Sequence, residues 1–386
     1  MTATPSKTLV LGAGLVGRTI SMDLAKDEGR QVTVVDVDQA RLDAVARIGG
    51  TLRARRADCG DVEVIASLCR EHELVVGALP SRLGLRTLEA VIRAGRPYCD
   101  ISFMSEDARV HHALAVEHGV TAIVDCGVAP GMSNLLAGVA ARRLQPCRSI
   151  TIRVGGLPVD HSGPWSYKAP FSPYDVIEEY LRPARLVRDG AIVVRDALTE
   201  PVSIDYPHVG ALEGFNTDGL RSLADTLDVP DMTEQTLRYP GYREAILLLR
   251  ESGLLDETPI EVDGAMVTPR SVTCAKLFPL WTYAPGEADL TIMRVEADGD
   301  LNGVPTRVQW DLYDEYDPTT GFLSMARTTA FPATIMARAI ESGMVERPGV
   351  HPPEVLADVP GLLEHLFAGL AVRGVEYSCT ETAMTV

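Results

Sequence analysis

Glycines spaced for binding a dinucleotide stand near the start of the chain, in the sequence GAGLVG of residues 12–17. Gly12 permits a tight turn, Gly14 lets the backbone approach a pyrophosphate, and Gly17 lets a helix pack close to a strand. Asp36 follows this motif at about the spacing expected for a carboxylate that binds a ribose hydroxyl. Because this carboxylate would repel the 2′-phosphate of NADP, we expect NAD rather than NADP as the cofactor.

Two alternatives to this interpretation stay open. A glycine-rich turn can serve the fold alone, without a ligand. Arg41 and the arginines at positions 53, 55 and 56 could bind a phosphate and so accept NADP.

The segments around these residues alternate between short apolar strands and helices. Strands are expected at residues 8–11, 31–35, 53–58, 74–80, 97–101 and 121–124, with helices at 87–94 and 108–118. This alternation predicts a Rossmann-type parallel sheet, in which ligands bind outside the carboxyl ends of the strands. The residues expected there to contact the cofactor are Gly12, Gly14, Leu15, Val16, Gly17, Asp36, Asp58, Ala78, Leu79, Pro80, Cys126, Gly127 and Val128.

The pattern changes after residue 146, where strands are expected at 149–154, 191–195, 287–296 and 307–313. The last two flank a turn at 299–303 and read as a hairpin. We therefore expect an α/β protein: a Rossmann domain over residues 1–125 and an α+β domain with a mixed or antiparallel sheet over 126–325. The first would bind the cofactor, and the second would provide catalysis and dimerisation. Residues 326–386 begin with a helical segment, and this C-terminal part is expected to pack back on the first domain.

Composition limits the function classes. The formal net charge of −17 disfavours nucleic-acid binding, because an acidic surface repels phosphates. No uninterrupted apolar run approaches the length of a membrane span, and the N-terminal run is too short for a signal peptide. Seven scattered cysteines without a Cys-x-x-Cys pair disfavour disulfides and zinc. We expect a cytoplasmic protein with a small-molecule substrate and no metal, membrane or nucleic-acid partner.

Several longer segments carry a family resemblance. They include DISFMSEDA at 100–108, VDCGVAPGMSNLLAG at 124–138, LEGFNTDGL at 212–220, TLRYPG at 236–241 and MARTTAFPATIMARAIESG at 325–343. With the glycine motif, they make the chain similar to the saccharopine dehydrogenase-like family, and most similar to its lysine 6-dehydrogenases. The resemblance implies NAD(P)-linked chemistry at a C–N bond and a homodimer or larger homo-oligomer.

For lysine 6-dehydrogenases the resemblance implies oxidation of the terminal amine of L-lysine to allysine, which cyclises, with release of ammonia. Lysine dehydrogenases carry glycine-histidine where this chain has Gly241 followed by Tyr242, and saccharopine-forming relatives often have an aromatic residue there. A saccharopine- or carboxynorspermidine-type reductase, which joins an amine to an aldehyde acid, is therefore the alternative. A third possibility is a regulatory protein that binds NAD without turnover.

This chemistry needs a base that deprotonates an ammonium group and an anchor for the substrate carboxylate. Tyr167 and Lys168 are the first candidates for proton transfer, with Asp100 as a possible relay or carboxamide ligand. Each has a structural alternative, since a loop lysine can be solvated, a tyrosine packed, and an aspartate a helix cap. The expected substrate-binding residues are Asn134, Glu213, Asp218, Arg238 as the carboxylate anchor, and Tyr242.

Overall fold

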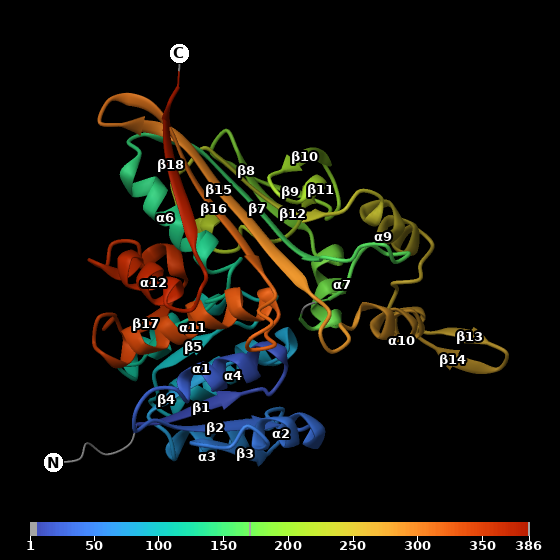
Figure 1. Ribbon diagram of the computed structural model, residues 1–386, viewed down its shortest axis with the longest axis vertical. Helices are drawn as coiled ribbons and strands as arrows, with labels where there is room; N and C mark the ends of the chain where they lie inside the picture. The colour runs from blue at the N-terminus through green and yellow to red at the C-terminus, as the bar shows by residue number, and fades with distance from the viewer. Residues whose placement is uncertain (1–5, 170, 385–386) are drawn as a thin grey trace.

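The first domain is built on a parallel sheet, as the sequence predicts (Figure 1). The computed structural model describes residues 6–169 and 171–384. The strand order is β17-β6-β5-β4-β1-β2-β3, and all neighbours run parallel. Its strands are β1 (Lys7–Leu11), β2 (Gln31–Asp36), β3 (Leu52–Arg56), β4 (Leu74–Gly77), β5 (Tyr98–Asp100), β6 (Thr121–Ile123) and β17 (Gly349–His351).

Helices connect these strands, so the carboxyl ends of β1, β2 and β4 share one edge. They are α1 (Leu15–Leu24), α2 (Gln39–Ala46), α3 (Val62–Arg70), α4 (Ser81–Arg93), the 3-10 turn η1 (Ala108–His111) and α5 (His112–Glu117). The third strand is shorter than expected, and it is an edge strand whose residues are mostly exposed. The remaining residues of the expected segment, 57–58, form the loop before α3, where Asp61 caps the helix by accepting a bond from the Glu63 amide.

The second sheet is mixed, with the order β10-β11-β12-β7-β15-β16-β18 and the β8–β9 hairpin beside β12. Within this second sheet, the β12–β7 pair is the only parallel one among the pairings of the described residues. Its strands are β7 (Cys147–Pro158), β8 (Ala184–Arg188), β9 (Ala191–Arg195), β10 (Val202–Tyr206), β11 (Gly210–Asn216), β12 (Asp231–Arg238), β15 (Asp289–Leu301), β16 (Val304–Glu315) and β18 (Tyr377–Ala383). The predicted hairpin is present as β15–β16, which pair from Leu290 with Glu315 to Leu301 with Val304.

Two long helices lie between the sheets. Both α6 (Met132–Arg143) and α11 (Ser324–Glu341) contribute buried side chains to one hydrophobic cluster that also contains Val10 of the first sheet and Met293 of the second. The domains therefore share a continuous core. The remaining helices of the body are α7 (Pro173–Leu181), α8 (Leu223–Thr226), the 3-10 turn η2 (Pro353–Leu356) and α12 (Leu362–Ala371).

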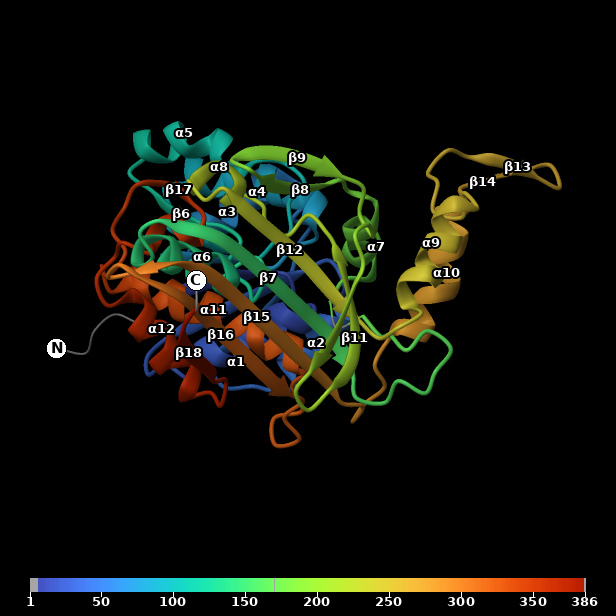
Figure 2. The same cartoon turned by 90° about the horizontal axis from the view of Figure 1, so that it is seen from above.

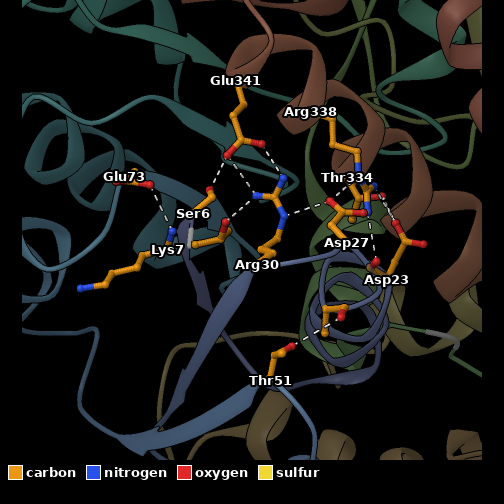
Figure 3. Close-up of polar contacts among 12 residues, drawn as sticks. Ser6, Lys7, Asp23, Asp27, Arg30, Thr51, Glu73, Thr334, Arg338 and Glu341 are labelled. Carbon is orange, nitrogen blue, oxygen red and sulfur yellow. Dashed lines mark hydrogen bonds and ion pairs between the residues drawn. The ribbon is translucent and has the colours of Figure 1, made fainter. Parts of the chain in front are cut away.

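The C-terminal segment contacts both domains. Helix α11 packs along α1, where Arg338 contacts Asp23 at 2.8 Å and Asp27 at 2.9 Å, and Thr334 donates to Asp23 at 2.7 Å (Figure 3). The carboxylate of Asp23 is 1% exposed, so these bonds fix the helix that follows the glycine motif. The segment also provides β17 to the first sheet and β18 to the second, which the sequence interpretation did not include.

An arm projects from the second domain in both views (Figures 1 and 2). It consists of α9 (Tyr242–Glu251), the hairpin of β13 (Ile260–Val262) and β14 (Ala265–Val267), and α10 (Pro269–Trp281). The base of the arm packs on α7 through a cluster that contains Tyr242, Trp281 and Ile177.

Candidate active site

The glycine motif forms the floor of a large cavity at the carboxyl edge of the first sheet. Gly12 has a φ of +103°, and a Cβ there would lie 2.3 Å from the Ala78 carbonyl oxygen. A Cβ on Gly17 would lie 2.1 Å from the Gly12 carbonyl oxygen, so α1 packs against the turn only with glycine there. Gly14 is the N-cap of α1 and provides no side-chain cap, which leaves backbone N–H groups at the helix start for a phosphate. This arrangement fits a dinucleotide.

Asp36 stands at the end of β2 with its carboxylate in the cavity wall. One oxygen accepts a bond from the Ala13 amide at 2.8 Å and the other from the Asp38 amide at 2.9 Å. The carboxylate is thus fixed where a ribose hydroxyl would be bound. Arg41 is exposed and pairs with Asp36 at 3.7 Å and with Asp38 at 3.5 Å, so this guanidinium would have to leave these carboxylates to contact a phosphate.

The cavity has a volume of about 1260 Å³ and is lined by both domains. This exceeds an ordinary small-ligand pocket and leaves room for a substrate beside a dinucleotide. Of the residues expected to contact the cofactor, those that line it are Gly12, Gly14, Leu15, Val16, Gly17, Asp36, Asp58, Ala78, Leu79, Pro80, Gly127 and Val128. Asp58 also accepts a bond from the Gly60 amide at 2.7 Å, which shapes its own turn.

The segment after β6 enters the site by its backbone. Gly131 has a φ of +145°, and a Cβ there would lie 1.9 Å from the Gly127 carbonyl oxygen. Cys126 is 3% exposed and does not line the cavity, and its burial raises the pKa of the thiol well above the usual range. Asn134 is fully buried, and its side-chain oxygen accepts bonds from the Gly131 amide and the Ser133 hydroxyl. It therefore caps the start of α6 outside the cavity wall.

A cluster of polar side chains forms the inner wall on the second domain. Glu234 of β12 is 2% exposed and accepts bonds from the Thr217 hydroxyl at 2.7 Å and the Gly219 amide at 3.1 Å. Burial, with a smaller contribution from the charge of Glu179, raises the pKa of Glu234 to about 8. The Thr236 hydroxyl bonds to Thr217 at 2.8 Å and to Glu179 of α7. Two carboxylates thus face the same part of the cavity.

Arg238 completes this wall and is 4% exposed. Its guanidinium carbon lies 4.8 Å from the Tyr167 ring centre and 6.0 Å from those of Tyr180 and Tyr242. Its Nε donates to the Tyr180 hydroxyl at 3.1 Å, and one terminal nitrogen lies 3.7 Å from Glu179. Tyr167 and Tyr242 are buried and lie outside the cavity lining, so they pack against the arginine side chain and hold it in position.

The other expected residues lie outside the cavity lining. Lys168 forms an ion pair with Glu287, and its ammonium lies 5.8 Å from the Tyr283 ring centre. Asp100 is fully buried and accepts bonds from Tyr98 and Ser102, and burial raises its pKa to about 6. Asp218 lies 3.6 Å from Arg221, although its neighbours Thr217 and Gly219 line the cavity. Glu213, on β11, also lies outside.

Sequence reasoning missed Glu234 and Glu179. Glu234 had one signal, since it is an ionisable residue inside a segment that reads as a strand, TEQTLR. Glu179 follows Glu178 on α7, and the sequence alone does not show which of the two faces the cavity. In the structure Glu178 pairs with Arg270, while Glu179 lines the cavity. The two domains also meet over the cavity, where the Ser81 hydroxyl at the start of α4 donates to Asp175 of α7 at 2.7 Å.

Two absences among the described residues bear on other function classes. These residues contain no group of three or more His, Cys, Asp or Glu side chains placed to hold a metal ion. Within the same part of the chain, no helix combines the length and apolarity that crossing a membrane requires.

Comparisons with known proteins agree with this geometry. Residues 8–123 match the family profile "Saccharopine dehydrogenase NADP binding domain", and residues 127–375 match "Saccharopine dehydrogenase C-terminal domain". Saccharopine dehydrogenase [NADP(+), L-glutamate-forming] of Saccharomyces cerevisiae is 21% identical over 89% of this chain and 93% of its own. Carboxynorspermidine synthase of Vibrio cholerae is 25% identical over 81% of this chain and 80% of its own.

A solved structure has the same fold. The apo form of the L-Glu-forming saccharopine dehydrogenase from Saccharomyces cerevisiae superposes with a TM-score of 0.79 at 20% identity, covering 98% of this chain and all of that one. The names of the family profile and of the yeast relative favour NADP, whereas Asp36 led us to expect NAD. Both the names and Asp36 agree on a nicotinamide dinucleotide, NAD(P).

Proposed function

The chain belongs to the saccharopine dehydrogenase family, and from that premise we propose that it oxidises the terminal amine of L-lysine or a close analogue. The amine, water and oxidised NAD(P) would yield allysine, ammonium, reduced NAD(P) and a proton, and the allysine would cyclise. The family's activity, NAD(P)-linked oxidoreduction at a C–N bond, is the coarser conclusion that the relatives support.

One observation carries the choice of substrate: the charges of the inner wall are complementary to lysine. Glu179, and Glu234 once it is ionised above about pH 8, can face two ammonium groups, and Arg238 can face one carboxylate. The cavity lining contains other arginines among the described residues, at 41, 82 and 86, but these are exposed and Arg238 alone is buried. Lysine, with two amines and one carboxylate, therefore matches this wall better than a substrate with three carboxylates does.

Glu234 is the group we assign to proton transfer. An ammonium must lose a proton before its carbon can give up a hydride, and a base works best when its pKa lies near the working pH. The pKa of Glu234, raised to about 8 by burial, meets this condition. The Thr217 hydroxyl and Gly219 amide both donate to one oxygen, Oε2, so the wall holds the carboxylate in place and leaves Oε1 for the substrate. Lys168, our first candidate from sequence, would have to leave Glu287 to take this role.

The bound dinucleotide would supply the hydride acceptor. The residues of this chain would hold it by the α1 N-terminus and by Asp36, and the backbone of Gly127 and Val128 would form the surface beneath its reactive ring. We propose NAD as the preferred form, because the Asp36 carboxylate is fixed by two backbone amides and cannot turn away from a 2′-phosphate.

The proposal is tested by mixing purified protein with L-lysine and either NAD or NADP at alkaline pH and following absorbance at 340 nm. We expect reduction of NAD that depends on lysine, with release of ammonia. No absorbance change with lysine under either cofactor would reject lysine as the substrate.

The second candidate is a reductase that joins an amine to an aldehyde acid. The names of the relatives favour it, since they act on saccharopine or form carboxynorspermidine. It predicts oxidation of saccharopine, or consumption of NAD(P)H when an amine and an aldehyde acid are supplied together, with no reaction of lysine alone. The same spectrophotometric assay separates the two candidates.

A further inference from the structure

The segment that leaves the arm brings a tyrosine into the wall of the cavity. Helix α10 ends at Trp281, and Tyr283, which follows shortly after, is part of the cavity lining. The turn after Tyr283 is fixed, because the Ala284 amide donates to the Glu287 carboxylate at 2.7 Å. The base of the arm therefore forms part of the wall of the site.

The hydroxyl of Tyr283 is buried and has no hydrogen-bond partner among the described residues. Buried polar atoms in folded proteins nearly always have a partner, so an orphaned hydroxyl in a cavity wall points to a group that binds there. Burial raises the pKa of Tyr283 well above its usual range. The hydroxyl therefore keeps its proton at alkaline pH and can donate one hydrogen bond to a ligand.

This hydroxyl stands at the Arg238 end of the inner wall. Glu234 and Arg238 face the cavity from the same side of β12, with about 13 Å between their Cα atoms. Strand β7 runs parallel to β12 and ends at Pro158, which pairs with Asp289 at the start of β15. The charges of Arg238 and Asp289 both act on the pKa of Tyr283, the first lowering it and the second raising it. The hydroxyl thus lies near the proposed carboxylate anchor.

Arg238 has only part of its hydrogen-bonding capacity left for a ligand. Its Nε donates to the Tyr180 hydroxyl, one terminal nitrogen donates to the Leu237 carbonyl oxygen at 2.9 Å, and the other lies 3.7 Å from Glu179. A guanidinium has five N–H groups, so about three remain, whereas a carboxylate offers about four lone-pair sites. A neutral donor beside the guanidinium would supply a further bond without adding a second positive charge.

We propose that Tyr283 is a second ligand of the substrate carboxylate and that, with Arg238, it selects an amino acid over a simple diamine. This inference rests on the proposed oxidation of lysine, in which the terminal amine faces Glu234 and the carboxylate lies at the other end of the wall. A hydrogen bond to a charged group strengthens binding by roughly 10- to 100-fold. The compound 1,5-diaminopentane is lysine without its carboxylate, so it makes no such bond and serves as the probe.

Replacing Tyr283 by phenylalanine removes the hydroxyl and keeps the ring. Y283F is expected to raise KM for L-lysine about 10- to 100-fold, with kcat changed by less than about threefold. The inhibition constant of 1,5-diaminopentane against lysine is expected to stay within about twofold of the wild-type value, because this compound has no carboxylate. An unchanged KM for lysine, or an equal loss of affinity for both compounds, overturns the inference.

A second tyrosine provides a matched control. Y377F, on β18, removes another buried hydroxyl that has no partner among the described residues, but one outside the cavity lining, and it is expected to keep the wild-type KM. Neither variant should lower the urea midpoint of the ligand-free protein, because an unpaired buried hydroxyl does not stabilise the fold. A marked fall in the midpoint of Y283F alone would assign the hydroxyl to the wall and overturn the inference.

Failure of the inference is distinguishable from failure of the proposed function. A wild-type protein that does not oxidise lysine rejects the proposed function, and the inference with it. A wild type that oxidises lysine, together with a Y283F variant that discriminates between lysine and 1,5-diaminopentane as well as wild type does, rejects the inference alone.

Discussion

Replacing Glu234 by glutamine is the sharpest test of the proposed chemistry. Glutamine has nearly the size of glutamate, and its side-chain oxygen can still accept the bonds from the Thr217 hydroxyl and the Gly219 amide. The wall of the cavity should therefore keep its shape while the base is lost. A positioned base contributes about 10²- to 10⁴-fold to a reaction rate, so we expect kcat for lysine oxidation to fall by that factor.

The same substitution that lowers kcat is expected to stabilise the folded protein at high pH. Burial raises the pKa of Glu234 from an ordinary 4.5 to about 8, so the folded state keeps a proton that the unfolded chain releases above about pH 4.5. The contribution of Glu234 to stability is then present below pH 4.5 and is lost as the pH rises through 8. This pKa difference corresponds to an upper limit of roughly 5 kcal/mol. E234Q lacks this loss, so it should be more stable than wild type at pH 9.

Two measurements check the prediction together: steady-state kinetics at 340 nm, and urea unfolding at pH 5 and pH 9. The matched control is E213Q on the neighbouring strand β11, which changes the same group outside the cavity lining and should keep kcat within about threefold. The reasoning is refuted if E234Q retains wild-type kcat, or if it unfolds at lower urea than wild type at pH 9.

Three further outcomes are expected. Arg238→Met should raise KM for lysine about 10- to 100-fold with a smaller change in kcat, because a charge-assisted bond to the substrate carboxylate contributes about 1.5–3 kcal/mol; an unchanged KM would contradict this. Asp36→Ser should improve kcat/KM with NADP relative to NAD by about tenfold or more, since it removes a carboxylate from the site of a 2′-phosphate; cofactor titrations measure the ratio. Lys168→Met should leave kcat within about threefold, because a partly exposed ion pair outside the cavity lining, such as Lys168–Glu287, contributes little; a large loss would return Lys168 to the chemistry.

The sequence predicted the first domain well because its signals are local. The glycine motif, the strand before it and Asp36 follow one another closely in the chain, and each follows from the backbone geometry that a dinucleotide site requires. Strand β17 escaped notice because Gly349–His351 is too short for a period-2 pattern, and because every strand of the second sheet except β18 lies between it and its partner β6 in the chain. Its assignment depends on tertiary contacts.

The inner wall of the site was harder to predict for the same reason. Arg238 was identified because a forked guanidinium in a conspicuous segment suggests a carboxylate anchor. Glu234 and Thr217 lie on separate segments that meet only when β12 is in place, so their bond has no sequence signal. Lys168 and Asp100 are residue types that could transfer a proton. The ion pair that holds Lys168 and the complete burial of Asp100 depend on neighbours that the sequence does not identify.

The position of β17 has a consequence for biosynthesis. When the ribosome has completed β6, the outer edge of the dinucleotide sheet is still unpaired, and its partner strand ends at His351. At a synthesis rate of about 5–20 residues per second, the chain from position 124 to position 351 takes roughly 11–46 s to make. During this interval the nascent chain exposes a strand edge that can pair with other chains. We therefore expect the dinucleotide sheet to be completed only after the strands β7 to β16 of the second sheet have been synthesised.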